Sequence, residues 1–405
     1  MEVNFPLILD GATGTQLQKR GYANGMCAEK WTLEHPEAIL DIQRSYIDAG
    51  SQVVYAPTFG ANRVKLEENG IFNQVEDYNI RLVELSRQAA GGRAWVAGDI
   101  APTGKFLAPM GDASFEELVE IYTEQAAALE KAGVDLFVIE TTMTLPEARA
   151  AVLAVKSVST KPVMVTFTCD ESGKTLTGTD VVAALVVMQG MGVDAFGLNC
   201  SVGPEAMLRQ LQRLSAYAEV PLIAKPNAGM PEIENGQTVY RCTPEEFADV
   251  VPEMAAAGVA IFGGCCGTEA GHVSALKKAA SRAMVKEPAP LHPELLQLAT
   301  EKKAFLLRPE VQCGRVLPAD ENLGDALEEA ADSPDKVISI SIKDEEQLEN
   351  FGDCQYAVAK PLCLCCEDAG LLEQALRLYQ GRAMYEGSLS DKALLPLCWR
   401  YGLVI

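Results

Sequence analysis

The chain has 405 residues, 48% of them hydrophobic, which is enough for one large buried core or two smaller ones. Its 56 acidic and 34 basic residues give a formal net charge of −22, and such an acidic surface disfavours nucleic acid and anionic lipid as partners. The sequence contains neither the roughly 20-residue apolar stretch that spans a bilayer nor a signal-peptide pattern at its start, so we expect a cytoplasmic protein with no membrane association.

Eight short apolar runs follow one another along the first part of the chain. They occupy residues 6–11, 52–59, 94–100, 135–141, 162–168, 194–200, 221–226 and 259–266. Each run is rich in Val, Ile, Leu or Phe and almost continuously apolar, which is typical of parallel strands that are buried on both faces. The runs therefore predict eight parallel strands.

Amphipathic stretches separate these runs. In "PEAILDIQRSYIDAG", Ile39, Ile42 and Tyr46 recur at helical spacing. In "FEELVEIYTEQAAALEKAG", the preceding Ser114 is placed to cap the helix, and Glu117 completes a capping box. Several stretches end in glycine just before the next strand, as helices do in αβ loops.

Eight strand–helix units within roughly 285 residues predict an α/β fold of the (β/α)8 TIM-barrel type over residues 1–285. A doubly wound open sheet is the alternative. That fold usually has a Gly-rich phosphate loop after its first strand, and "DGATGT", the one candidate, lacks the GxGxxG pattern. The Pro-rich segment 286–294, "KEPAPLHPE", reads as a linker. Residues 295–405 then predict a small C-terminal α/β domain of unknown role.

Polar residues stand where the predicted strands end, and functional groups of such barrels cluster at the C-terminal ends of the strands. These residues are Asp10, Thr58, Asp99, Glu140, Asn199, Cys200, Asn227, Cys265 and Cys266. Cys200 ends the sixth strand, and Cys265 and Cys266 end the eighth. Three thiols that face one point, with one position left open, form the ligand pattern of a catalytic zinc ion. Gly263 and Gly264 would relax the strand end, so that consecutive thiols turn toward one ion.

The other cysteines read differently. A buried cysteine is most often a small hydrophobic residue, and we interpret Cys27, Cys169, Cys242, Cys313, Cys354 and Cys398 in this way. The segment "PLCLCC" (361–366) resembles a metal-binding motif. However, Cys363 and Cys365 alternate along a strand, Cys366 faces the other way, and no further thiol cluster is expected nearby, so we interpret the segment as a buried strand.

Several motifs together resemble the homocysteine S-methyltransferase family. They are "LDGATGTQL", "TFGAN", "GDIAPTG", "FVIETTMTLPEARAA", "LTGTD", "GLNCSVGPE", "KPNAGMPEIENGQTVY" and "IFGGCCGT", in order over residues 3–285. The likeness is strongest to the homocysteine-binding barrel of cobalamin-dependent methionine synthase. The resemblance implies a (β/α)8 barrel, zinc bound by Cys200, Cys265 and Cys266, and Asn227 as a weak ligand when substrate is absent. It also implies that Asp10 and Glu140 hold the homocysteine amino group.

We also place Thr58 and Asn199 among the substrate-binding residues, and we expect no catalytic side chain beyond the activated substrate thiol. The resemblance implies zinc-dependent methyl transfer to the thiol of homocysteine, which gives methionine. The sequence lacks the Asp-x-His-x-x-Gly pattern that ligates cobalamin, so we expect a methyl-corrinoid (methylcobalamin) supplied in trans by a separate corrinoid protein.

Other functions stay open at this point. The donor could be a small molecule: S-methylmethionine, betaine or methyltetrahydrofolate. The protein could also be a non-catalytic subunit that binds homocysteine or zinc. A redox protein that uses Cys265 and Cys266 is a further alternative, which predicts reversible oxidation without metal.

Overall fold

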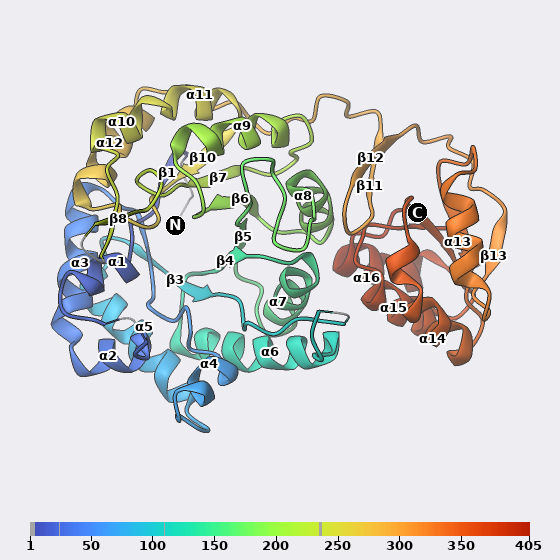
Figure 1. Ribbon diagram of the computed structural model, residues 1–405, viewed down its shortest axis with the longest axis horizontal. Helices are drawn as coiled ribbons and strands as arrows, with labels where there is room; N and C mark the ends of the chain where they lie inside the picture. Colours follow the sequence, from blue (N-terminus) through green and yellow to red (C-terminus); the bar gives the residue numbers. More distant parts are fainter. Residues whose placement is uncertain (1–4, 24, 109, 235–236) are drawn as a thin grey trace. The chain divides into compact units, whose positions relative to one another are not determined.

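The computed structural model describes residues 5–23, 25–108, 110–234 and 237–405 (Figure 1). The chain forms two compact units. The first comprises Met1–Leu176, Asp194–Ser215 and Val220–Pro288, and the second comprises Thr177–Val193, Ala216–Glu219 and Ala289–Ile405.

The first unit contains an eight-stranded parallel sheet in the order β1-β10-β7-β6-β5-β4-β3-β2. Its strands are β1 (Leu7–Ile8), β2 (Val53–Tyr55), β3 (Trp95–Ile100), β4 (Leu136–Thr142), β5 (Val163–Phe167), β6 (Ala195–Asn199), β7 (Leu222–Lys225) and β10 (Val259–Phe262). The backbone N–H of Gln52, just before β2, donates to the carbonyl of Ile8 in β1 at 2.7 Å, so the two outermost strands meet. The predicted (β/α)8 TIM barrel is confirmed.

Helices surround these strands (Figure 1). They are α1 (Gly14–Gln18), α2 (Ala28–Glu34), α3 (Pro36–Ala49), α4 (Arg63–Glu68), α5 (Val75–Ala90), α6 (Phe115–Ala132), α7 (Leu145–Val158), α9 (Pro204–Leu214), α10 (Pro244–Asp249), α11 (Val251–Ala256) and α12 (Ala270–Ala280). Ser114 caps α6 as expected, because its hydroxyl accepts from the N–H of Glu117 at 3.0 Å. The Glu117 carboxylate does not complete the capping box: it pairs instead with Lys105 at 3.0 Å.

Side chains from all eight strands fill the barrel interior. The buried cluster consists of Leu7, Leu9, Val53, Tyr55, Ala97, Leu136, Val138, Met164, Ala195, Ile223, Ala260 and Ile261. Interiors of such barrels are packed layers of side chains rather than pores. Polar side chains are therefore left to the ends of the strands, where the candidate site lies.

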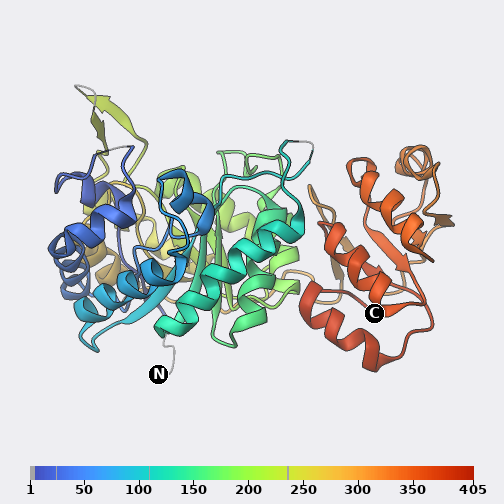
Figure 2. The same cartoon turned by 90° about the horizontal axis from the view of Figure 1, so that it is seen from below.

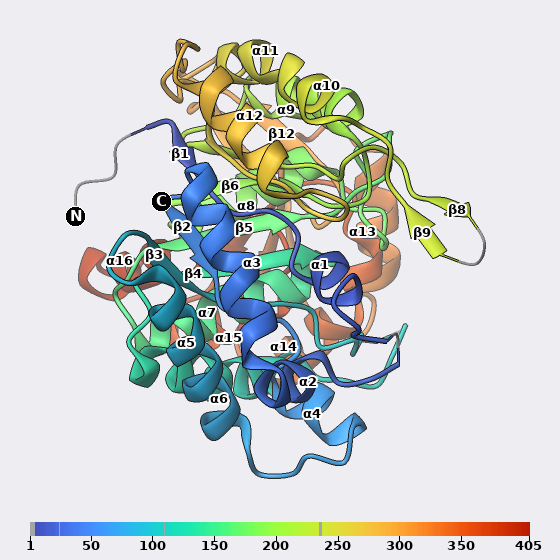
Figure 3. The ribbon, with the colours of Figure 1, turned by 90° about the vertical axis from the view of Figure 1, so that its left-hand side faces the viewer.

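A small antiparallel hairpin is inserted after β7. It consists of β8 (Glu232–Glu234) and β9 (Gln237–Val239), and it projects away from the barrel (Figure 2 and Figure 3). Arg241 pairs with Glu232 at 2.6 Å and also with Glu234, so an ionic contact joins the two sides of the hairpin. Tyr240 follows β9 directly and leads back toward the strand ends.

The second unit contains a four-stranded parallel sheet in the order β13-β14-β15-β16 and an antiparallel hairpin, β11-β12. The strands are β11 (Leu296–Ala299), β12 (Ala304–Leu307), β13 (Val316–Pro318), β14 (Ile338–Ser341), β15 (Leu362–Cys365) and β16 (Met384–Tyr385). The helices are α8 (Val181–Gly190), α13 (Leu323–Ala331), α14 (Glu345–Asp353), α15 (Ala369–Leu378), α16 (Asp391–Tyr401) and the 3-10 helix η1 (Gln355–Ala357). A C-terminal α/β domain was expected.

The division between the units differs from the predicted boundaries in one respect. The break after Pro288 lies inside the predicted linker 286–294, but helix α8 groups with the second unit. The sequence of α8, "VVAALVVMQG", is apolar all round, and every residue from Val181 to Gln189 is buried. Within the second unit, α8 packs against β11 and α16. A helix without a polar face needs cover on all sides, and sequence alone does not say which segment supplies it.

Across the described residues, no helix combines the length and apolarity needed to cross a membrane.

Candidate active site

Three cysteine thiols meet at the C-terminal ends of two barrel strands. Cys200 directly follows β6, and Cys265 and Cys266 follow β10 after two glycines. Their three sulfur atoms lie within 4.8 Å of one another. The structure therefore brings together the three residues that the sequence predicted to share one ion.

An uncommon backbone conformation aims the Cys200 thiol. Cys200 has φ of +61° and the next residue, Ser201, has φ of +59°. Non-glycine residues seldom adopt this left-handed conformation, and clusters of such residues occur mostly at functional sites. Thr141, at the end of β4 in the same pocket, has φ of +57°. The barrel thus accepts backbone strain where its polar side chains converge.

Gly263 and Gly264 are needed for space rather than for conformational freedom, because neither has a positive φ. A Cβ on Gly263 would lie 2.9 Å from Cβ of Leu9, and a Cβ on Gly264 would lie 2.4 Å from the hydroxyl oxygen of Thr268. The expected relaxation of the strand end by the two glycines is therefore not the reason for their presence. Tight packing around the loop leaves no room for a side chain at either position before Cys265 and Cys266.

The three thiols share one negative charge. Hydrogen bonds from Cys265 and then Cys266 lower the pKa of Cys200 to about 3, although burial opposes the shift. The hydrogen bond to Cys200 raises the pKa of Cys266 to about 11, and the pKa of Cys265 lies well above its ordinary value for the same reason. A cation would be needed to hold all three as thiolates at neutral pH, which is the chemistry that a thiophilic metal ion supplies.

Asn227 lies beside this cluster. Its side-chain amide hydrogen-bonds to Cys200, and its Oδ1 atom is buried without a hydrogen-bond partner in the described parts of the chain. A buried carbonyl oxygen without a partner is costly, and it would be satisfied by an additional contact to a cation. Three thiols and one amide oxygen therefore form a donor set that suits zinc.

Tyr240 also reaches the thiols, and the sequence analysis did not single it out. Its phenol hydrogen-bonds to the Cys266 sulfur, and burial together with the neighbouring cysteines raises its pKa. Its ring lies against Gly267, where a Cβ would come within 2.3 Å of the ring. The only sequence signal was its place in the motif "KPNAGMPEIENGQTVY".

A buried lysine holds the two carboxylates that were predicted to bind the substrate. Nζ of Lys225, at the end of β7, lies 3.2 Å from Asp10 and 3.7 Å from Glu140. It also lies 3.6 Å from the centre of the Tyr55 ring. The backbone N–H of Tyr55 donates to the other oxygen of Asp10 at 2.7 Å. Sequence reasoning missed Lys225, although a lysine at the end of the apolar run "PLIAK" was a usable signal.

The charges in this part of the site do not balance. Asp10, Glu140 and Asp99 are three buried carboxyl groups around one buried ammonium, and Oδ1 of Asp99 has no hydrogen-bond partner among the described residues. Burial raises the pKa of all three acids, and Lys225 offsets this only in part. Burial opposes the charge of Lys225, but Asp10, Tyr55 and Glu140 raise its pKa well above the ordinary range. An additional ammonium group would compensate the remaining negative charge.

Thr58 and Asn199 are buried and engaged with protein groups. The Thr58 hydroxyl donates to the Asp99 carbonyl at 2.8 Å and accepts from the Asp99 N–H at 3.2 Å. The Asn199 amide donates to the Thr141 hydroxyl at 2.8 Å and to Glu140 at 3.4 Å. Neither residue lines the pocket, so these contacts position Asp99 and Glu140. Their direct contact with substrate stays a prediction.

One pocket of about 300 Å³ contains both groups of residues. Cys200, Cys265 and Cys266 line it together with Asp10, Glu140, Asp99 and Lys225. The Tyr55 side chain also lines it, and its buried hydroxyl has no hydrogen-bond partner in the parts of the chain that are described. A small molecule in this pocket would meet both sulfur ligands and acidic groups.

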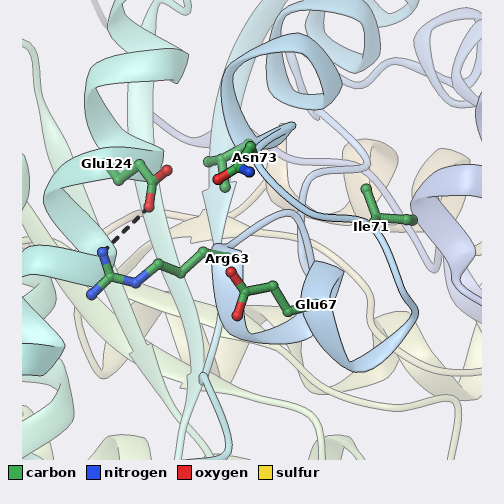
Figure 4. Close-up of a pocket in the computed structure, with 6 residues that line it drawn as sticks. Arg63, Glu67, Ile71, Asn73 and Glu124 are labelled. Carbon is green, nitrogen blue, oxygen red and sulfur yellow. Dashed lines mark ion pairs between the residues drawn. The ribbon is translucent and has the colours of Figure 1, made fainter.

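A separate pocket of about 390 Å³ lies near α4 and α6 (Figure 4). Arg63 points toward Glu124 there, at 3.6 Å, and the Glu67 side chain lies below the arginine in the view. Ile71, Asn73 and Val75 complete the lining. The lining residues include neither a thiol nor a lysine, so this pocket has none of the chemistry seen at the strand ends.

Comparison with known proteins agrees with this geometry. Residues 7–280 match the family model for homocysteine S-methyltransferase. The chain belongs to the homocysteine S-methyltransferase family. It is 32% identical to methionine synthase of Mycobacterium leprae over 296 residues, which are 68% of this chain and 24% of that protein. It is also 32% identical to methionine synthase of Mycobacterium tuberculosis over 302 residues, which are 70% of this chain and 25% of that protein.

The chain thus spans about a quarter of the length of these methionine synthases. Among solved structures, the metallated form of the homocysteine methyltransferase MmuM from Escherichia coli is similar, with a TM-score of 0.59 and 28% identity. The match covers 67% of this homocysteine S-methyltransferase family member and 95% of MmuM. The family resemblance seen in the sequence is confirmed.

Proposed function

We propose that this chain catalyses methyl transfer to the thiol of homocysteine and so produces methionine. The observation that carries the proposal is the shared pocket, in which three convergent thiols and an acidic cluster with excess negative charge face one small cavity. Homocysteine has a thiol at one end and an ammonium group at the other. The family membership supports the same substrate.

Zn²⁺ suits the thiol cluster, with Cys200, Cys265 and Cys266 as ligands and Asn227 as a weak ligand when substrate is absent. Such an ion would supply the homocysteine thiol as a thiolate at neutral pH, where a free thiol is mostly protonated. Tyr240 would hold Cys266 in place from the hairpin side through its hydrogen bond.

Asp10, Glu140 and Asp99 would receive the ammonium group of homocysteine. Lys225 keeps Asp10 and Glu140 in position through its ion pairs, and Asn199 orients Glu140. This arrangement would fix the direction of the bound amino acid, so that its sulfur lies toward the thiols. Binding in one orientation lowers the barrier of a bimolecular transfer.

In the transfer, the substrate thiol releases its proton to solvent, and an electron pair of its sulfur forms the bond to the methyl carbon. The bond between the methyl group and its donor breaks at the same time, and its electron pair stays with the donor. The motif resemblance to the homocysteine-binding barrel of cobalamin-dependent methionine synthase favours a methyl-corrinoid carried by a separate protein as the donor. S-methylmethionine, betaine and methyltetrahydrofolate are the alternative donors.

The test is a donor comparison with the full chain, loaded with zinc and reduced. Methylcobalamin, S-methylmethionine, betaine and methyltetrahydrofolate are offered in turn with homocysteine, and methionine is quantified. We expect slow turnover with free methylcobalamin and none with Cys265→Ser. Rapid turnover with a small-molecule donor alone would show that this molecule, and not a methyl-corrinoid, is the methyl donor. Homocysteine binding without methionine formation from any donor would leave a non-catalytic subunit and refute the proposed activity.

A further inference from the structure

A second group of side chains of metal-ligand type lies in the C-terminal unit, away from the barrel thiols in the sequence. The sulfur atoms of Cys313 and Cys363 and a carboxylate oxygen of Glu386 all lie within 4.8 Å of one another. Cys363 is in β15, Cys313 is in the segment between β12 and β13, and Glu386 follows β16. The prediction of a buried strand at 361–366 was correct, but the expectation that no thiol cluster lies near it was wrong, because Cys313 comes from 50 positions earlier in the chain.

The sheet carries its polar side chains on one face. Strand β14 reads "ISIS" and strand β15 reads "LCLC", and the register pairs Ser339 with Cys363 and Ser341 with Cys365. Side chains alternate along a strand, so these four share a face, while the Ile and Leu residues share the opposite one. Met384 of β16 pairs with Cys363, and Glu386 stands two positions beyond it, on the same side.

One buried atom on this face lacks a partner. Ser339 is fully buried, and its hydroxyl oxygen has no hydrogen-bond partner within the described ranges of the chain. Its register partner is Cys363, so the hydroxyl stands beside the thiols. An unpaired buried hydroxyl is costly in an apolar core, and it is accounted for when a bound ion or its water supplies the partner.

An apolar core alone explains the thiols but not the carboxylate. Cys363 packs with Leu298 and Val337, as a small hydrophobic residue would. Glu386, in contrast, brings a carboxylate oxygen to within 4.8 Å of both sulfur atoms. A carboxylate oxygen and two sulfur atoms at this spacing can all serve as donors to one cation. The backbone N–H of Gly314 donates to the Val337 carbonyl at 3.0 Å and so holds Cys313 against the sheet.

We propose that Cys313, Cys363 and Glu386 bind a thiophilic divalent cation of the Zn²⁺ class. The thiol of Cys363 donates a hydrogen bond to that of Cys365, which lies outside the 4.8 Å cluster, so water would complete a tetrahedral site. Each thiol that coordinates the ion releases its proton to solvent. The ion would tie the segment 308–315 to the sheet. This site is independent of the proposed methyl transfer, which uses other cysteines.

The first experiment counts metal in the full chain. Proteins are purified with a reducing agent, loaded with zinc, freed of excess ion and analysed by mass spectrometry. We expect two zinc ions per wild-type chain and one in the triple variant Cys200→Ser, Cys265→Ser, Cys266→Ser. Adding Cys313→Ser to the triple variant should remove the last ion. Adding Cys398→Ser instead, on α16 and also half-buried, should leave it in place.

A second experiment tests the same site without replacing Cys313 or Cys363, in case those variants fold poorly. Glu386→Gln changes an exposed side chain by one atom. Loss of an outer-shell partner of a metal weakens binding by about 10–100-fold, so removal of a direct ligand should weaken zinc binding to the triple variant at least as much. Co²⁺ serves as the spectroscopic probe, since sulfur-to-cobalt charge-transfer bands report thiolate ligands.

Three results would overturn the proposal. The triple variant could be folded by circular dichroism and bind neither zinc nor cobalt. Glu386→Gln and Cys313→Ser could both leave its metal content unchanged. A Cys313–Cys363 disulfide could form in air while the reduced protein takes up no metal, which would make the cluster a redox pair. None of these results bears on the barrel thiols, whose own metal is counted separately in a Cys313→Ser, Glu386→Gln background.

Discussion

The ammonium group of Lys225 lies 3.2 Å from the carboxylate of Asp10, and both side chains are almost fully buried. The pair joins the first barrel strand to the seventh, 215 positions apart in the sequence. Removing one member of a buried ion pair is strongly destabilising, because the other charge is left uncompensated. The pair therefore contributes to the fold as well as to the shape of the pocket.

Lys225→Met should lower the free energy of unfolding by about 3 kcal/mol, because it leaves Asp10 and Glu140 buried without a counter-charge. Urea unfolding followed by circular dichroism measures the change. Lys278→Met, on the exposed face of α12, is the matched control and should cost less than about 0.5 kcal/mol. Adding Asp10→Asn to Lys225→Met should restore part of the loss. An unchanged unfolding midpoint in Lys225→Met would contradict the role given to the pair.

Glu140→Gln should weaken homocysteine binding at least about tenfold, since a charge-assisted hydrogen bond to the substrate ammonium is worth roughly 1.5–3 kcal/mol. Zinc content should stay the same, because Glu140 is not among the thiol ligands. Calorimetric titration with homocysteine measures the affinity, and Glu68→Gln on exposed α4 is the control. If the affinity of Glu140→Gln equals that of the wild type, Glu140 does not contact the substrate.

Much of the fold was predictable because buried parallel strands read as short apolar runs, and each of the eight runs covers all or nearly all of one barrel strand. The thiol cluster was predictable for a related reason: Cys200, Cys265 and Cys266 stand at strand ends, and all strand ends of a barrel meet at one mouth. Contacts that depend on side-chain direction were not predictable. The sequence placed Lys225 at the end of a predicted strand but gave no partner for it. The structure shows that its ammonium group pairs with Asp10 and Glu140.

The contact between Cys313 and Cys363 illustrates the same limit. Cys313 lies in an irregular segment that a backbone hydrogen bond from Gly314 to Val337 joins to the sheet. Neither periodicity nor spacing encodes that path. The assignment of α8 to the second unit was also missed. The sequence pattern gives the order of strands and helices along the chain, but it does not show which compact unit each helix joins.

Asp99→Asn should make the protein more stable at pH 7, by about 2 kcal/mol, because a buried carboxylate oxygen without a partner loses its charge. Burial and the nearby Glu140 raise the pKa of Asp99 in the folded state well above its ordinary value. The folded state then binds the proton more tightly than the unfolded state, so wild-type stability falls as pH rises from the ordinary Asp range through the raised pKa. The advantage of Asp99→Asn should shrink toward zero near pH 4. Urea unfolding of both proteins from pH 4 to 8 measures the difference, and a constant difference would show that Asp99 does not titrate as described.

Tyr240→Phe should weaken zinc binding at the barrel site about tenfold, the usual cost of removing an outer-shell hydrogen bond to a metal ligand. Competition with a chromogenic chelator measures the affinity, in the Cys313→Ser, Glu386→Gln background that leaves one site. Tyr356→Phe, at an exposed position in η1, is the control. Unchanged affinity in Tyr240→Phe would mean that its phenol does not support Cys266 in the metal-bound protein.

Zinc binding to the barrel thiols should release about two protons per ion at pH 7. Without metal the three thiols share one negative charge, because Cys265 and Cys266 stabilise the Cys200 thiolate and are themselves shifted to higher pKa values. Three thiolate ligands require the remaining two protons to leave. Calorimetric titrations of the single-site background in buffers with different ionisation enthalpies measure the number of protons. Cys266→Ser should release about one proton, because a single protonated thiol then remains to be ionised. Release of three protons by the intact cluster would show that Cys200 is a neutral thiol before metal arrives, and release of none would exclude Cys265 and Cys266 as thiolate ligands.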